Sequence, residues 1–427
     1  MRERDRVLGP KSQNETDAGA GREGPSLAPD RFERRRADII AAAIPVLNSH
    51  GFKGMRLTTV AELIGLRATG VTYYFPRKEE LAVACLESGY AIFNDLLDQA
   101  EQGPDAASRI AWLIALFVDR DAAVRRGEAL PLASFAAIRA LEGEHRERVV
   151  QGYVRMFRRV RSLLDTPEMA HLDGTDRTIR ALVLLEQLYW ANVWLGDFDL
   201  DHFPRLARRM TDCVINGIVP AGAALDPGDL DLRAAIAPAD AAKESFLMAA
   251  TRQINAHGYR GASVDRISAA LNLTKGAFYH HNEAKDELVA ACFRRSFGIA
   301  REAQRRVADL PGTELQRLAV AVAGLIRFQL GPEGPLLRTS VLSSMPQEHQ
   351  VEIISQSYKV SRQFSAMIAD AVTDGSARPV DPAVAGALLH AAINVASDVR
   401  ILAIAQDADI VGRFVQVLFG GLSARQA

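Results

Sequence analysis

The sequence is poor in cysteine and in long apolar runs, and each shortage excludes a class of protein. Its 427 residues contain three cysteines, which are Cys85, Cys213 and Cys292. An odd and widely spaced set fits a reducing cytosol and argues against a disulfide framework. The most apolar window, residues 179–195, contains a glutamate and is shorter than the roughly 20 residues that cross a bilayer. We therefore expect a cytoplasmic protein without a membrane partner.

Net charge is also low, and motifs for chemistry are missing. The formal net charge is −1, so any binding to nucleic acid must come from local basic patches. We find no glycine-rich phosphate loop, nucleophile elbow, metal-spaced cluster or pair of carboxylates at a catalytic spacing. The sequence therefore predicts neither catalysis, nor a cofactor, nor a metal site.

What the sequence does contain is a long repeat. The stretch GLRATGVTYYFPRKEEL at 65–81 returns as NLTKGAFYHHNEAKDEL at 272–288, at a constant offset of 207 residues. Further on, PLASFAAIRALEGEH at 131–145 resembles PLLRTSVLSSMPQEH at 335–349, at an offset of 204. Such a period is too long for a solenoid and predicts a duplicated domain. Residues 220–240, rich in Ala, Pro, Gly and Asp, are typical of a linker between the copies.

The pattern of apolar residues predicts an all-α chain. Apolar side chains recur at helical spacing between glycine and proline stops, and no convincing alternating strand pattern is present. Residues 58–64 and 68–74 are predicted to be two short helices joined by a tight turn at Gly65. Such a pair describes a helix-turn-helix, whose second helix enters the major groove of DNA. The residues predicted to point outward are Arg67, Thr69, Thr72 and Tyr73.

Both copies resemble the N-terminal DNA-binding segment of the TetR/AcrR family of transcriptional regulators. In the first copy the resemblance is carried by Gly51, Phe52, Gly65, Tyr73, Phe75, Pro76, Lys78, Glu80 and Leu81. In the second copy it is carried by Gly258, Tyr259, Ser263, Val264, Ile267, Thr274, Lys275, Gly276, Tyr279, His281, Lys285 and Leu288. The rest of each half has the length and helicity expected of the family's variable ligand-binding domain.

The resemblance implies a bacterial, nucleoid-associated regulator that binds a double-stranded DNA operator, with repression as the usual outcome. In the family, the tyrosine and the lysine at these positions contact phosphates. The candidate DNA-binding residues are Arg67, Thr69, Thr72, Tyr73 and Lys78 in the first copy, and Thr274, Lys275, Gly276, Tyr279, His280 and Lys285 in the second. The alternative for Tyr73 is an aromatic core cluster with its two neighbours, and for the lysines a solvated surface.

The copies differ where DNA contact is expected. Thr274 keeps the residue that caps the recognition helix, whereas Arg67 replaces it in the first copy. The aromatic residue Phe75 becomes Asn282, and a glutamate follows it. We therefore expect the first unit to be the better kept and the second to be weaker, repositioned or degenerate. His280 and its histidine neighbour suggest a metal site, but adjacent helical residues diverge by about 100°, so DNA-facing polar residues are favoured.

Aromatic residues outside these units are candidates for a pocket that binds an unidentified small-molecule effector. In the first half they are Trp112, Phe117, Phe135, Tyr189 and Trp190, and in the second Phe328, Met345, Phe364 and His390. The alternative is ordinary core packing. Different linings would mean different ligands, or one half without a ligand.

Proteins of the family pair as two-fold dimers through their last two helices. Here the equivalent segments are predicted at residues 176–195, 203–218, 382–403 and 407–422, and we expect them to pair within one chain as a pseudo-dimer, with a homodimer as the alternative. The expected divisions are a disordered tail (1–30), a first helix-turn-helix unit (31–81), a first regulatory domain (82–219), a linker (220–240), a second helix-turn-helix unit (241–288) and a second regulatory domain (289–427). The competing function is a ligand sensor or scaffold in which one or both units have lost specific DNA binding.

Overall fold

The computed structural model describes residues 27–220, 223, 225–233, 241–270, 285–345, 347–400 and 407–423. These residues form helices and turns without a strand among them, so the all-α prediction is confirmed. Over the same ranges, no helix combines the length and the apolar character needed to cross a membrane. The predicted tail up to residue 26 and the second recognition segment, 271–284, lie outside the described residues.

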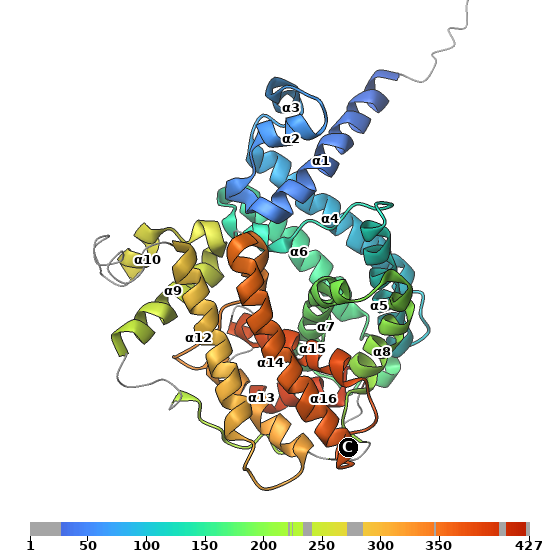
Figure 1. The fold of residues 1–427 in the computed structure, drawn as a ribbon. Helices are drawn as coiled ribbons and strands as arrows, with labels where there is room; N and C mark the ends of the chain where they lie inside the picture. Colours follow the sequence, from blue (N-terminus) through green and yellow to red (C-terminus); the bar gives the residue numbers. More distant parts are fainter. Residues whose placement is uncertain are drawn as a thin grey trace, which may run out of the picture.

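The first half opens with the predicted helix-turn-helix and continues into longer helices (Figure 1). Its elements are α1 (Leu27–Gly54), α2 (Leu57–Leu63), α3 (Ala68–Tyr74), α4 (Lys78–Ala100), α5 (Ala106–Arg125), η1 (Phe135–Ala140), α6 (Gly143–Ser162), η2 (Pro167–Met169), α7 (Gly174–Trp194), η3 (Leu195–Asp197), η4 (Leu200–His202) and α8 (Phe203–Asn216), where η marks a 3₁₀ helix. Gly51 interrupts α1 with φ 62°, a value that glycine adopts without strain.

The second half follows a parallel order. Its described elements are α9 (Ala241–Gly261), α10 (Val264–Ala270), α12 (Lys285–Arg306), α13 (Glu314–Leu330), η7 (Thr339–Ser344), α14 (Gln347–Thr373), α15 (Pro382–Ile393), η8 (Asn394–Arg400) and α16 (Ile410–Gly420). Gly258, 207 residues after Gly51, interrupts α9 with φ 73°.

One predicted helix is wrong in its length. The segment 382–403 was expected to be one α-helix, but α15 ends at Ile393 and the chain continues as 3₁₀ helix η8. Asn394 donates its side-chain amide to the carbonyl of His390 (3.5 Å), and the Ser397 hydroxyl donates to the carbonyl of Asn394 (3.1 Å). Side chains that bond to nearby carbonyls compete with the α-helical pattern, and this explains the early end.

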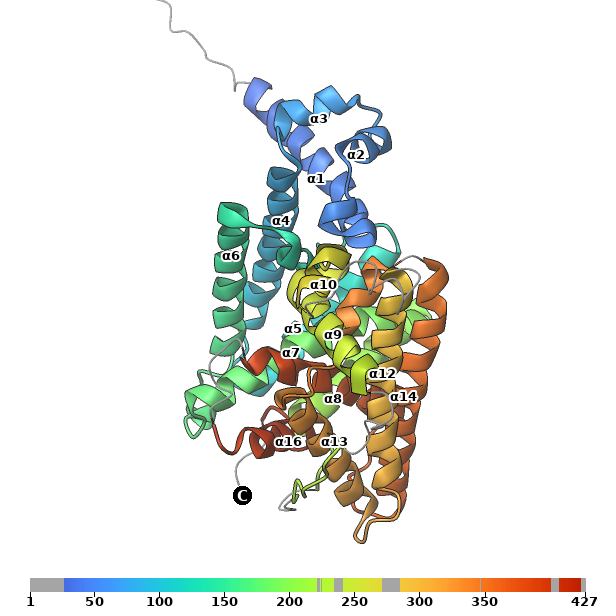
Figure 2. The same ribbon diagram turned by 90° about the vertical axis from the view of Figure 1, so that its left-hand side faces the viewer.

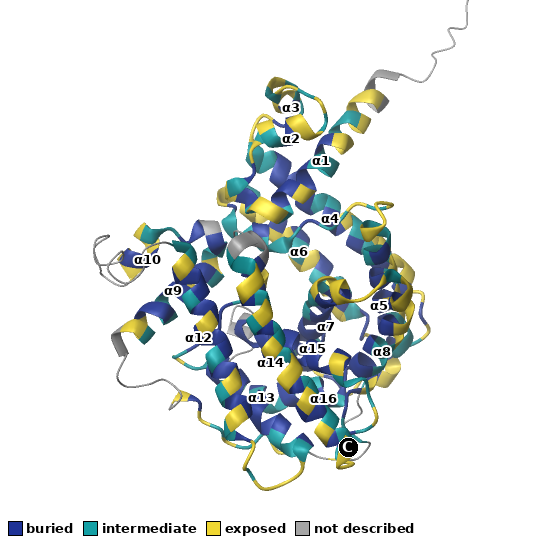
Figure 3. Ribbon diagram, in the orientation of Figure 1, coloured by how far each residue is buried: buried dark blue, intermediate teal, exposed yellow. Residues whose placement is uncertain are grey.

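Each half has its own helical core. Helix α4 packs against α1, α5 and α6, and α12 packs in the same way against α9, α13 and α14. The apolar stripe of α4 is fully enclosed, because Leu81, Phe93 and Leu97 have no exposed surface. Figure 3 shows the exposed residues gathered on the outer helices and the buried ones along α7 and α15.

The predicted linker is partly ordered against the second half. Leu232 is buried, and the Arg306 guanidinium donates to the carbonyl of Asp231 at 3.0 Å. Arg327 donates to the carbonyl of Gly228. Residues 225–233 therefore lie along α12 and α13, and this part of the linker is a packed strip rather than an extended free tether.

The two halves meet along a seam formed by α7, α8, α15 and α16. Helix α7 packs against α15 and α16, and α8 packs against α15. The guanidinium of Arg413 lies 2.9 Å from Asp173 and 2.8 Å from Asp176. Arg180, which is only 2% exposed, donates to the carbonyl of Leu422 at 3.0 Å. Apolar packing and charged hydrogen bonds therefore join the halves along their last helices.

Two glycines let the backbones of α8 and α16 touch at this seam. Gly217 has φ 64° and Gly421 has φ 81°. A Cβ atom on Gly217 would lie 2.1 Å from the carbonyl oxygen of Phe419, so no other residue fits there without a shift. The amide of Ile218 donates to the same carbonyl at 2.7 Å, and the amide of Leu422 donates across the seam at 2.8 Å. The contact is a direct backbone crossing.

The Gly217→Ala variant should lose stability because its Cβ would collide with the Phe419 carbonyl. We expect a cost of about 1–3 kcal/mol for this overpacking, in addition to the roughly 1 kcal/mol of strain that a positive φ imposes. Gly127→Ala is the control, because Gly127 has φ 76° but open space around it. Thermal unfolding should give a clearly larger decrease in Tm for Gly217→Ala; equal decreases would contradict the crossing.

Candidate DNA interface

The first helix-turn-helix unit projects from the rest of the molecule, with α2 and α3 at the top of Figure 1 and of Figure 2. Gly65 makes the turn with φ 64°, and the Leu66 amide donates to the carbonyl of Ala61 at 2.8 Å. Val71 has no exposed surface and Phe75 is 2% exposed, so the expected role of Phe75 as a core anchor is confirmed. These contacts fix α3 from one side and leave its other side facing solvent.

The predicted contact residues of the first unit share that free side. Arg67, Thr69, Thr72 and Tyr73 are all exposed, and Tyr73 is exposed over 73% of its surface. Its ring touches the ring of Tyr74 at 5.1 Å between centroids, but it is not enclosed. A tyrosine this exposed contributes little to a core, so its position fits contact with a partner better than core packing.

The start of α1 adds arginines that the sequence analysis did not select. The ring of Phe32 lies 4.7 Å from that of Tyr74 and 6.1 Å from that of Tyr73. This packing brings the N-terminal turns of α1, with Arg31 and Arg34 exposed, to the edge of α3. The run RFERRR was the available signal. Residues 31–81 hold nine Lys and Arg against five Asp and Glu, a local excess of positive charge.

Each half has a lysine in the first turn of the helix that follows the helix-turn-helix. Lys78 opens α4 with its Nζ 4.7 Å from the ring centroid of Phe52, and Lys285 opens α12 with its Nζ 4.9 Å from the ring of Tyr259. The two pairs are 207 residues apart. A cation–π contact holds each ammonium near backbone N–H groups at the helix start, where a phosphate would be stabilised.

The second unit is described only as far as residue 270. Helix α10 contains Ile267, which has no exposed surface. The predicted contact residues Thr274, Lys275, Gly276, Tyr279 and His280 lie outside the described residues. Residues 241–288 hold six Lys and Arg against five Asp and Glu, so this unit is less basic than the first.

The start of α6 touches both units through weak ion pairs. Arg77, just before α4, lies 3.9 Å from Glu144, and Arg266 of α10 lies 3.3 Å from Glu142. Both glutamates are largely exposed, and such pairs contribute about 0–1 kcal/mol each. Phosphates of a bound DNA would therefore compete easily for these arginines.

A pair of asparagines links each unit to its regulatory domain. Asn48 in α1 donates to the carbonyl of Leu132 at 2.9 Å and accepts from the amide of Ser134 at 2.7 Å. Asn255 in α9 makes the corresponding bonds with the carbonyl of Leu336 (2.9 Å) and the amide of Arg338 (3.1 Å). The segments that precede η1 and η7 are thus clamped to the first helix of each unit.

The structure divides the candidate pocket residues into several groups. Trp112 lies on the outer face of α5 with 44% of its surface exposed, because its neighbours Leu113 and Ile114 take the core positions. The tightly packed members are Phe117, Phe328 and Met345. Phe135, Tyr189 and Trp190 are half-buried, and the Trp190 ring lies 6.5 Å from that of His390 across the seam.

Phe364 and His390 line a cavity of about 20 Å³ in the second half. Burial lowers the pKa of His390 to about 4, so this imidazole is neutral at pH 7. A space of this size holds about one water molecule. Sites for drug-sized ligands enclose about 300–1,000 Å³, so as described the cavity does not hold an effector of that size.

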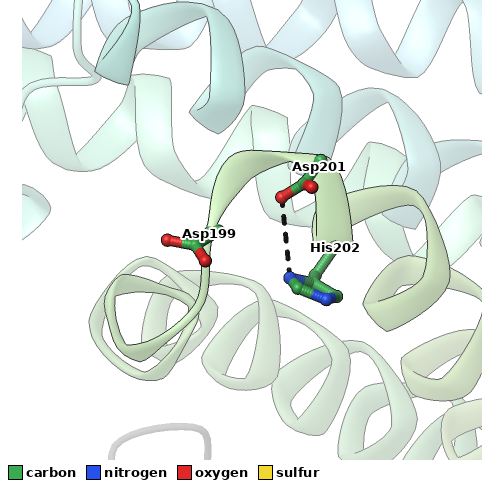
Figure 4. Close-up of side chains that lie close together, drawn as sticks. All are labelled: Asp199, Asp201 and His202. Carbon is green, nitrogen blue, oxygen red and sulfur yellow. Dashed lines mark ion pairs between the residues drawn. The ribbon is translucent and has the colours of Figure 1, made fainter.

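Three side chains near the start of α8 have the composition of a metal site. They are Asp199, Asp201 and His202, all exposed, and the Nδ1 atom of His202 lies 3.6 Å from a carboxylate oxygen of Asp201 (Figure 4). Exposed carboxylates are well hydrated, and their proximity alone does not define a metal site.

Comparison with known proteins identifies the family of one segment. Residues 246–292 match the family described as bacterial regulatory proteins, tetR family. The chain is 42% identical over 52 residues to the HTH-type transcriptional regulator RutR of Escherichia coli K12, which is 12% of this chain and 24% of that protein. It is 37% identical over 62 residues to the HTH-type transcriptional repressor NicS of Pseudomonas putida, which is 14% of this chain and 29% of that protein. The chain therefore spans less than a third of the length of these relatives.

Two solved structures are similar over about half of the chain. The crystal structure of apo AibR aligns with 42% of this chain and 98% of its own length, at 24% identity and a TM-score of 0.34. A transcriptional regulator of the TetR/AcrR family from Thermobifida fusca aligns with 44% of this chain and 100% of its own, at 21% identity and a TM-score of 0.32. Scores this low carry no argument about the fold.

The family match falls on the second copy, although we expected the first to be better kept. The matched range includes Asn282 and Glu283, so the loss of the aromatic anchor does not remove the family character. It also includes Phe246, Ile267 and Leu288, whose side chains are buried. The buried pattern that holds the unit together is therefore present in the matched segment.

The Asn48→Ala variant should loosen the segment that Asn48 clamps. Loss of the side chain leaves the Ser134 amide without its partner, at a local cost of about 1–3 kcal/mol. We expect faster hydrogen exchange in residues 131–140, measured by mass spectrometry. Asn216→Ala is the control, because that amide donates to Asp212 on an exposed face. Unchanged exchange in residues 131–140 would argue against the clamp.

Proposed function

We propose that this protein is a sequence-specific, DNA-binding transcriptional regulator of the TetR/AcrR type. The observation that carries the proposal is the match of residues 246–292 to the tetR family of regulatory proteins. The free outer side of α3, with its exposed Arg67 and Tyr73, supports it. The proposed location is the bacterial cytoplasm, in association with the nucleoid.

The proposed DNA contacts have different roles. Arg67 and the two threonines of α3 face outward, where they meet base edges when α3 lies in the major groove. Tyr73 and Lys78 bind phosphates on either side of the groove, which positions the helix without reading sequence. In the second unit Thr274, Lys275, Gly276, Tyr279, His280 and Lys285 take these roles.

We further propose that the chain acts as a single-chain pseudo-dimer. The packing of α7 and α8 on α15 and α16 supports this, as do the contacts that recur after about 200 residues at Asn48 and Asn255 and at Lys78 and Lys285. The two units then reach DNA together, and the tether raises the effective concentration of the second. The proposed domains are those bounded at residues 30, 81, 219, 240 and 288.

Regulation would follow from a change in the relative position of the two units. A small molecule bound between the regulatory helices favours an arrangement that misfits the operator, and the operator is released. Repression is the proposed sign, in line with the name of NicS.

Removal of the proposed phosphate contacts should weaken DNA binding and its dependence on salt. We expect Tyr73→Ala and Lys78→Ala each to reduce affinity for the DNA upstream of the chain's own gene, and Lys78→Ala to lower the slope of log K against log salt by about 1. Lys359→Ala, an exposed lysine on α14, is the control. Fluorescence anisotropy at several salt concentrations measures both. Variants that bind like the wild type would contradict the proposed interface.

The bound complex should contain one chain on an operator with two dissimilar half-sites. RATGVTYY and TKGAFYHH present different side chains and cannot make the same base contacts, so a palindrome is not the expected best site. Selection from random DNA gives the operator, and light scattering gives the mass of the complex. A perfect palindrome, or two chains joined through α8 and α16 of different copies, would overturn the pseudo-dimer.

A second candidate is a ligand sensor or scaffold that no longer reads DNA through one or both units. The lower charge of residues 241–288 and the acidic Glu283 favour it for the second unit. The salt-dependent measurement separates the two, because a sensor shows no specific binding even at low salt.

A further inference from the structure

A group of polar side chains lies deep between the two halves without being sealed. Arg139 of η1, Tyr153 of α6 and Glu186 of α7 are surrounded by protein, and burial raises the pKa of Glu186 and lowers that of Arg139. Each nevertheless retains part of its accessible surface. Side chains that are deep and still accessible line an internal space.

Aromatic rings form one side of this space. The ring of Phe135 lies 5.0 Å from that of Tyr90, 5.8 Å from that of Tyr153 and 5.2 Å from that of Tyr189. The hydroxyl oxygen of Tyr189 is enclosed and has no hydrogen-bond partner. A buried hydroxyl without a partner costs about 1–3 kcal/mol, which a bound molecule would recover by accepting its proton.

The second half completes the group. Arg338, just before η7, acts electrostatically on Glu186 and Arg139. Arg139 donates to the hydroxyl of Ser340 in η7 at 3.4 Å. The space is therefore bounded by both halves, and neither half alone contains it.

The corresponding place in the second half differs. Phe297 stands 207 residues after Tyr90, and Thr339 stands 204 residues after Phe135. These two residues line the cavity of about 20 Å³ that also contains His390. The wall formed by Phe135 has no aromatic counterpart there, and the space that remains is the size of a water molecule.

We propose that the space around Phe135, Glu186 and Tyr189 is a single effector site in each chain, for a small uncharged aromatic ring that carries an amide. The amide N–H donates to Glu186, its carbonyl accepts from the Tyr189 hydroxyl, and the ring packs on Phe135. A charged ligand is disfavoured on both sides: Arg139 and Arg338 oppose a cation, and Glu186 opposes an anion. The regulatory consequence rests on the proposed function, but binding itself does not.

The site has a short route to both helix-turn-helix units. Phe135 is the first residue of η1, next to Ser134, whose amide Asn48 of α1 holds. Helix α9 of the second unit packs directly against η1. A ligand that displaces Phe135 therefore moves a segment that contacts the first helix of each unit, which is the coupling that a regulator requires.

Binding is tested on the full chain by calorimetry and ligand-detected NMR with benzamide as the probe. We expect one benzamide per chain, with benzoate and benzylamine at least tenfold weaker. Tyr189→Phe, which removes only the hydroxyl, should weaken benzamide about two- to tenfold, as loss of one hydrogen bond does. Glu186→Met should weaken it further, and Phe364→Leu, in the cavity of the second half, should leave it unchanged.

Several results would overturn the site: no benzamide binding, two equivalents per chain, equal affinity for the charged analogues, or Tyr189→Phe binding as tightly as wild type. Because DNA is absent from this measurement, these results do not depend on the proposed function. A second assay adds the operator. Asn48→Ala should still bind benzamide but lose most of the effect of benzamide on DNA affinity; an unchanged effect would contradict coupling through η1.

Discussion

The backbones of α8 and α16 touch at Gly217 and Gly421, and the placement of every element of one half relative to the other depends on that contact. Helices with side chains at these positions would be held apart by the width of a Cβ atom and its neighbours. The close approach lets Ile218 and Leu422 exchange backbone hydrogen bonds across the seam. Because cores are closely packed, a shift here would be transmitted to α7 and α15 rather than absorbed.

That seam explains how one chain can contain composite features. With α7 held against α15, η1 of the first half lies against α9 of the second, and Arg139 reaches Ser340. In a dimer of identical subunits every such contact would appear twice. Fusion removes that requirement, so Phe135 can form an aromatic wall while Thr339 lines a water-sized cavity, and Arg67 can differ from Thr274 at the start of the recognition helix.

Local features were the most predictable. Residues 58–64 and 68–74 were expected to be helices and form α2 at 57–63 and α3 at 68–74, because Gly65 and the apolar spacing are signals within a few residues. Phe75 was correctly placed in the core. The helix over 382–403 was wrong because Asn394 and Ser397 bond to the backbone in a way that spacing does not reveal. Trp112 turned outward because both of its neighbours are better placed to fill the core.

The sequence by itself determined the helical fold, the long repeat and the outward residues of α3, since each depends on periodicity or on motifs along the chain. Only the tertiary structure decided that the linker packs on α12 and α13, that the arginines of α1 stand beside α3, and that Glu186, Tyr189 and Arg338 share one space. Those relations join residues far apart in the chain. They depend on how closely α8 and α16 approach, which the positive φ of Gly217 allows and which no local pattern encodes.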